Sequence, residues 1–157
     1  MSLAIEKTLV PATGHPTRPV GDAADQKLNI SVVFTSVEST LAALKEAGNL
    51  ANSLGARIML IVPQVVPYPL PLETPPVLVE FGENRFRVMA SESAVETSVQ
   101  IYLCRDRLGT LLSVLTPGSV VVLGGRKRRW AWWPTKDERL ARRLRLTGYE
   151  VLFKETE

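Results

Sequence analysis

Residues 28–62, LNISVVFTSVESTLAALKEAGNLANSLGARIMLIV, contain the pattern that decides the fold. Apolar residues alternate with period two over 28–34, and 57–62 is an unbroken apolar run, so both segments are expected to be strands. Apolar residues recur at helical spacing between them. A strand, a helix and a buried strand in this order predict a βαβ unit, which in turn predicts a parallel sheet.

Both ends of the helix in this unit have end signals. Thr35 and Glu38 have the spacing of a capping box, with Thr35 as the N-cap and Glu38 three residues on. At the other end the apolar pattern stops at Leu54, and Gly55 is suited to the left-handed conformation that commonly ends a helix. The helix is therefore expected to end at about Leu54.

The rest of the chain continues the alternation of helix and strand. The segment 63–76 contains six prolines and is expected to be an extended loop. A helix is expected next, with Val77, Phe81, Phe86 and Val88 facing the sheet, although Gly82 weakens it. The expected later elements are a helix over 77–91, an edge strand over 95–103, a helix over 106–115, a strand over 120–123, a helix from the Thr135–Glu138 capping box to Gly148, and a strand over 149–153.

Length and composition are those of one globular domain. The chain has 157 residues, of which 45% are hydrophobic and 22% charged. Residues 1–27 contain scattered prolines and glycines without a sustained period, and we expect a flexible segment there. Residues 28–157 are expected to form the α/β domain.

The cysteine content and the length of the apolar runs indicate the compartment of the protein and whether it spans a membrane. The single cysteine, Cys104, excludes an internal disulfide and is typical of a reducing compartment. No apolar run approaches the roughly 20 residues of a membrane span. We therefore expect a cytoplasmic protein without a transmembrane segment.

Residues 124–134, GGRKRRWAWWP, form the segment most suggestive of binding. A glycine pair between a strand and a helix is where open α/β folds usually hold a phosphate. This segment also carries four consecutive basic residues and all three tryptophans. Between 124 and 145 there are nine basic and two acidic residues, although the whole chain has a net charge of only +3, which favours an anionic partner. A salt-bridged loop beside a solvated helix face would give the same pattern.

The chain resembles the universal stress protein family. The resemblance rests on the order and spacing of elements over 28–153, on Leu54-Gly55-Ala56-Arg57 before the second strand, and on the segment 117–124, PGSVVVLG. It implies a doubly wound α/β fold, with a five-stranded parallel sheet of order 3-2-1-4-5 and helices on both faces. The loops after strands one and four would then meet at the topological switch point.

The resemblance also implies where a nucleotide would bind, and the sequence departs from that pattern. Nucleotide-binding members have an aspartate after strand one, then Gly-x-x-Gly after strand four and a later Gly-Ser or Gly-Thr. Only Gly124 matches, because Thr35 stands at the aspartate, Lys127 at the second glycine, and Asp137-Glu138 near the Gly-Ser pair. A lysine side chain obstructs the close approach of backbone N–H groups to phosphate, and two carboxylates repel it. The family's ATP site is therefore expected to be dismantled.

Several roles remain open for the loop and its surroundings. Side chains can hold a phosphate, a sulfate or a nucleotide such as ATP or AMP, although we expect no bound cofactor. Trp and Arg also suit contact with an acidic protein, an anionic membrane surface or single-stranded nucleic acid, although no specific nucleic-acid module is present. Alternatively, the tryptophans fill the space that a nucleotide would occupy. The candidate anion-binding residues are Thr35, Ser36, Gly124, Gly125, Arg126, Lys127, Arg128 and Arg129, and the candidate interaction or pocket-filling aromatics are Trp130, Trp132 and Trp133.

No catalytic or metal-ligand constellation accompanies these residues. Cys104 lies beside Arg105 and Arg107, which can lower a thiol pKa, or it is a small buried hydrophobe. The overall expectation is a non-catalytic binding or regulatory module of the universal stress type, not an enzyme. Its last strand is expected at a free edge, where it can pair with a second copy to form a homodimer.

Overall fold

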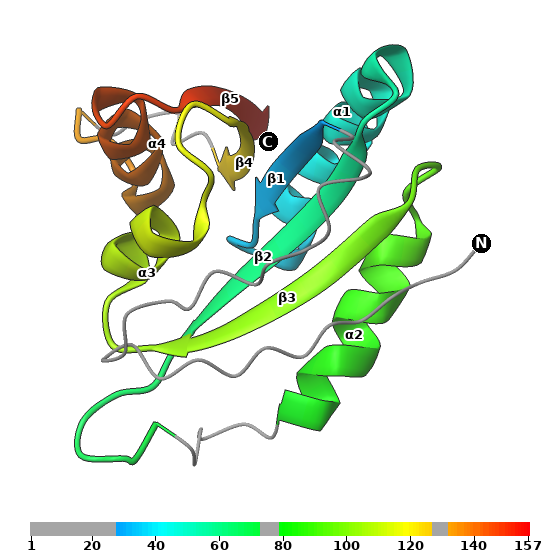
Figure 1. Cartoon of the computed structure of the whole chain (residues 1–157). Coiled ribbons are helices and arrows are strands. Elements are labelled where there is room, and N and C mark those ends of the chain that lie inside the picture. The colour runs from blue at the N-terminus through cyan, green and yellow to red at the C-terminus, as the bar shows by residue number, and fades with distance from the viewer. Residues whose placement is uncertain (1–27, 73–78, 127–131) are drawn as a thin grey trace.

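The computed structural model describes residues 28–72, 79–126 and 132–157 (Figure 1). The expectation of a flexible segment over 1–27 lies outside these residues. The strands are β1 (Asn29–Val33), β2 (Arg57–Val65), β3 (Thr97–Cys104), β4 (Val120–Arg126) and β5 (Glu150–Thr156). The helices are α1 (Val37–Leu54), α2 (Val79–Ser91), α3 (Arg107–Val114) and α4 (Lys136–Leu146).

The five strands form one parallel sheet of order β3-β2-β1-β4-β5, which confirms the predicted fold class. The chain moves outward from β1 to β3 and then returns to β4 on the other side of β1. The carboxyl ends of β1 and β4 are therefore neighbours, with Val33 in register with Leu123. This reversal of strand order is the topological switch point.

Helices cover both faces of the sheet, and each face has its own apolar core. In Figure 1, α1 and α2 lie on one side and α3 and α4 on the other. Leu44 of α1 and Phe86 of α2 pack on one face with Val32 and Leu60. The opposite core includes Leu111 of α3 and Leu140, Ala141 and Leu144 of α4. The parallel strands are thus buried on both sides, as their apolar runs predict.

The N-cap of α1 is Ser36, not Thr35 as predicted. The Ser36 hydroxyl accepts the Ser39 N–H at 3.3 Å, and Gly55 ends the helix with a φ of 64°, as expected for its left-handed cap. Thr35 is drawn away from the cap because its hydroxyl donates to the Gly124 carbonyl in β4. The capping box of α4 is present as predicted, between Thr135 and Glu138.

β2 extends to Val65, past the proline at which we expected the loop to begin. Ile61 is the last β2 residue in register with β1, and its carbonyl accepts the Phe34 N–H. Pro63 is two residues further along β2, so its ring nitrogen points to the same edge of the strand as the Ile61 carbonyl. At that level β1 has already ended. No ladder hydrogen bond is lost there, so the strand continues through the proline along β3.

The face that α2 turns to the sheet differs in part from the expected one. Phe86 is buried as expected, together with Met89 and Ala90, whereas Val88, which was also expected to face the sheet, is 62% exposed. Residues 86, 89 and 90 have the spacing of one helix face, and Val88 lies off it. Within the described residues, no helix is long and apolar enough to cross a membrane.

Candidate functional site

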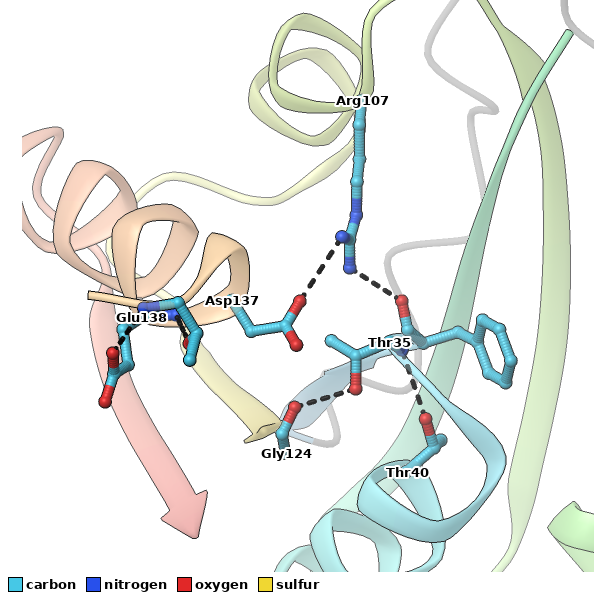
Figure 2. Close-up of polar contacts among 8 residues, drawn as sticks. Thr35, Thr40, Arg107, Gly124, Asp137 and Glu138 are labelled. Atoms are coloured by element: carbon cyan, nitrogen blue, oxygen red, sulfur yellow. Dashed lines mark hydrogen bonds and ion pairs between the residues drawn. The ribbon is translucent and has the colours of Figure 1, made fainter. Parts of the chain in front are cut away.

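The carboxyl ends of β1 and β4 are tied together by a hydrogen bond from the first candidate residue. The Thr35 hydroxyl donates to the Gly124 carbonyl at 2.7 Å, and the Thr35 N–H donates to the Thr40 hydroxyl at 3.2 Å (Figure 2). Thr35 thus uses both its N–H and its hydroxyl within the protein. Thr35 stands at the position that the resemblance aligns with the family's aspartate. In this chain its hydroxyl instead connects the end of β1 to β4 through the Gly124 carbonyl.

An arginine that we did not predict as a site residue spans the switch point. Arg107, the first residue of α3, donates a hydrogen bond to the Phe34 carbonyl at 2.8 Å. Its other terminal nitrogen lies 3.5 Å from the Asp137 carboxylate in the first turn of α4. Figure 2 shows the guanidinium between these two oxygens. The side chains of Arg107 and Asp137 are 28% and 27% exposed, so the pair is partly shielded from solvent.

Two helix caps hold this ion pair in place. Asp106 caps α3 by accepting the N–H groups of Leu108 and Gly109, at 3.3 and 2.9 Å. At α4, Thr135 accepts the Glu138 N–H at 3.2 Å, and the Glu138 carboxylate accepts the Thr135 N–H at 2.6 Å. The caps fix the first turns that carry Arg107 and Asp137. Of the two carboxylates expected near the nucleotide, one is therefore ion-paired and the other belongs to a cap.

Gly124 and Gly125 lie inside β4 rather than in a loop after it, which corrects the expectation that the strand ends at residue 123. They are in register with Lys154 and Glu155 of β5. A Cβ on Gly124 would lie 1.9 Å from the Ser39 carbonyl oxygen, and one on Gly125 would lie 2.4 Å from the Phe153 ring. The glycines are therefore explained by the close packing of α1 and Phe153 on β4.

The basic loop is only partly described. Arg126, its first residue, is exposed and forms an ion pair of 3.3 Å with Glu38 of α1. Lys127, Arg128, Arg129 and Trp130 lie outside the described residues. Ser36 is exposed at the start of α1. The structure thus brings together the candidates at one end of β1 and β4: Thr35, Ser36, Gly124, Gly125 and Arg126. Of their polar side chains, those of Ser36 and Arg126 are exposed to solvent.

Two of the three tryptophans project from the protein. Trp132 is fully exposed and Trp133 is 82% exposed, immediately before α4. The pocket-filling alternative is therefore wrong for these two rings. Above the switch point the structure places the ion pair of Arg107 and Asp137 instead.

A second arginine at the end of β3 holds the segment after β2. Arg105 donates to the carbonyls of Val66 at 2.7 Å and Leu70 at 2.5 Å. Its guanidinium also lies 4.2 Å from the centre of the Tyr68 ring, a cation–π contact. The described start of the proline-rich segment is thus fastened along the carboxyl end of β3.

Cys104 is buried in the folded protein. It has no exposed surface, and its thiol lies 3.7 Å from the Gln64 carbonyl. Burial raises its pKa and is the largest cause of the shift; the hydrogen bond with Thr110 lowers the pKa in part, the Asp106 carboxylate raises it further, and Arg107 lowers it. In the described part of the chain, no three His, Cys, Asp or Glu residues gather as a metal site would require.

Comparison with known proteins supports the fold. No family model matches the sequence, and no curated protein matches it. Among solved structures, the chain is similar to a universal stress protein in complex with cAMP, with a TM-score of 0.50 and 15% sequence identity. The match covers 83% of this chain and 98% of the other. At this identity the likeness shows a shared fold.

Proposed function

We propose that the protein is a non-catalytic binding or regulatory module of the universal stress type, in which the usual ATP position has been lost. The observation that carries this proposal is the Arg107 guanidinium at the switch point. It is held between the Phe34 carbonyl and the Asp137 carboxylate, where the fold would otherwise receive a nucleotide.

The electrostatics of the ion pair support this proposal. A phosphate that took Arg107 would have to displace Asp137 and leave that carboxylate partly buried beside another negative charge. An uncompensated charge in such a place costs several kcal/mol, by general estimates of about 3–5 kcal/mol for a fully buried pair. The cost opposes binding of ATP more strongly than binding of a small neutral ligand.

The neighbouring backbone supports it as well. In open α/β folds, phosphates are held by N–H groups of a glycine loop at a helix N-terminus. Here Gly124 and Gly125 are paired strand residues, and α4 begins with its own capping box. The first described residue available to a ligand after the glycines is Arg126, a side chain rather than a backbone donor.

The proposed module is a homodimer that pairs through β5. This strand is hydrogen-bonded to β4 on one side and is the last in the sheet order, so its other edge is free within the described sheet. Leu152 on this strand is 39% exposed. An edge strand with exposed apolar surface favours pairing with a second copy.

A second candidate function is binding of phosphate or a nucleotide by the basic loop. Two observations favour it: the structurally similar universal stress protein was solved with cAMP, and the ion pair that the Arg126 side chain forms with Glu38 is exposed. An exposed pair contributes little, so a phosphate can replace Glu38 at small cost. In this mode the nucleotide would be recognised by side chains of the basic loop rather than by Arg107 or by backbone N–H groups of a glycine loop.

Thermal unfolding with ATP, AMP, cAMP, phosphate and sulfate at equal ionic strength separates the two candidates. The lost-site proposal predicts that no adenine nucleotide raises the melting temperature more than phosphate does. A larger rise with a nucleotide that disappears in Arg126→Gln supports the second candidate. A larger rise that survives Arg126→Gln and disappears in Arg107→Gln overturns the lost-site proposal.

A further inference from the structure

The outer face of α4 carries a row of basic side chains, which we call the basic stripe. Its members are exposed and are spaced three, three and one residues apart. At 100° per residue they cover about 120° of the helix, opposite the buried residues Leu140, Ala141 and Leu144. The stripe consists of Lys136, Arg139, Arg142 and Arg143.

The charge of this stripe is not neutralised by its own helix. Within the described ranges, none of its four residues makes an ion pair. The two acidic residues of α4 point elsewhere: Asp137 is paired with Arg107, and Glu138 is bonded to the Thr135 backbone. Four positive charges therefore face solvent together.

Apolar side chains stand at both ends of the stripe. Trp132 and Trp133, the tryptophan pair, project just before its first residue, and Leu146 is 79% exposed at its far end. Figure 1 shows α4 at the outer side of the molecule, beyond β4 and β5. The helix spans roughly 16 Å, and at 100° per residue Leu146 falls within the arc of the basic stripe, so charged and apolar groups lie close together along this short helix.

We propose that this face docks on an anionic lipid bilayer. Tryptophan rings prefer the interface between headgroups and acyl chains, and basic residues near an anionic surface each add affinity. A protein partner normally contacts a contiguous patch whose centre is depleted of charge. Here the basic stripe separates the tryptophan pair from Leu146. An anionic bilayer can contact such separated groups because its lipids move to fit them. The membrane is touched peripherally, by side chains of a folded domain.

Vesicle binding tests this proposal. The full chain is mixed with large vesicles of one of two compositions, phosphatidylcholine alone or phosphatidylcholine with about 30 mole per cent phosphatidylserine, which gives an anionic surface. Bound protein is then separated by flotation. Binding is expected only with phosphatidylserine and is expected to weaken with added salt. The variant R139Q/R142Q/R143Q is expected to bind on the order of a hundredfold more weakly, since each charge is worth about fivefold.

A matched control removes the same charge elsewhere. The variant K45Q/R85Q/R87Q takes three exposed basic residues from α1 and α2, on the other side of the sheet, and is expected to keep most of the binding. Circular dichroism and thermal midpoints establish that both variants fold. Equal loss of binding in the two variants would mean that only net charge matters, and the proposal would be wrong.

Fluorescence tests the tryptophan pair directly. In the Trp130→Phe variant, Trp132 and Trp133 are the two remaining tryptophans of the sequence, so tryptophan fluorescence reports on this pair alone. Their emission is expected to shift to shorter wavelength with phosphatidylserine vesicles and to be quenched by brominated acyl chains. Unchanged emission on saturating vesicles overturns the proposal. So does binding to polyglutamate without binding to vesicles, which would identify the face as a site for an acidic protein.

Discussion

Arg107 at the start of α3 and Asp137 at the start of α4 meet at 3.5 Å above the carboxyl ends of β1 and β4. They are thirty residues apart in the sequence, and the doubly wound sheet brings their helices to the same edge. Because both helices begin there, each offers the side chain of its first turn to the switch point. The result is an ion pair at the position that nucleotides take in folds of this kind.

Removing Arg107 is expected to destabilise the protein. Arg107→Met keeps most of the side-chain volume but loses the charged hydrogen bond to Phe34 and the partner of Asp137. We expect a loss of about 1–3 kcal/mol in the free energy of unfolding, measured by urea denaturation. The matched control, Arg87→Met on the exposed side of α2, should change it by less than about 0.5 kcal/mol. Equal stability of Arg107→Met and wild type would contradict the proposed bridge.

The glycine in β4 is expected to tolerate no side chain. Gly124→Ala places a Cβ against the Ser39 backbone, which cannot move without shifting α1. We expect a loss of about 3 kcal/mol or more in the free energy of unfolding. Gly48→Ala in α1 is the control, since its Cβ meets nothing closer than the Ser93 hydroxyl at 3.7 Å. That variant should gain about 0.5–1 kcal/mol from helix propensity. Gains in both variants would show that α1 and β4 are not packed this closely.

Cys104 is expected to react slowly with alkylating reagents. Burial raises its pKa, so the folded protein keeps the thiol protonated at pH values where an unfolded chain has begun to lose the proton. The folded state then binds more protons than the unfolded state, and stability falls as the pH rises through and above the ordinary thiol pKa. Iodoacetamide labelling followed by mass spectrometry should be slow at pH 7–8 without denaturant and fast with it. Rapid labelling of the folded protein at pH 7 would indicate an activated thiol.

Dimerisation through β5 is expected to depend on its exposed apolar residue. Leu152→Lys places a charge on the proposed pairing edge, where two copies would bring like charges together. Sedimentation at two protein concentrations should show a dimer for the wild type and a monomer for the variant. Lys45→Gln on the exposed side of α1 serves as the control and should remain dimeric. A monomeric wild type at both concentrations would exclude the proposed dimer.

The sheet and its order could be predicted because local signals agree with one another. The apolar runs of β1, β2 and β4, the Thr135–Glu138 capping box and the Gly55 cap all identify elements of a parallel sheet. The sequence predicts the N-cap of α1 one residue too early, because Thr35 and Ser36 are equally good caps. The choice between them is made by the Gly124 carbonyl in β4, 89 residues away.

The site was harder to predict because its main contacts are long-range. The glycine pair predicts a loop, since glycine is common in loops, but in the structure it allows α1 and Phe153 to pack closely on β4. Arg107 gave no signal beyond being a basic residue next to a predicted helix start. Its role depends on Asp137 and on the Phe34 carbonyl, which only the folded sheet brings together.

Isothermal titration of ATP with magnesium into the wild-type protein, with inorganic phosphate as the reference ligand, tests the central claim most directly. If Arg107 and Asp137 have replaced the nucleotide, ATP should give no saturable heat beyond that of phosphate. Saturable ATP binding that outcompetes phosphate and is abolished by Arg107→Gln would contradict the claim, because the guanidinium would then be part of a working nucleotide site.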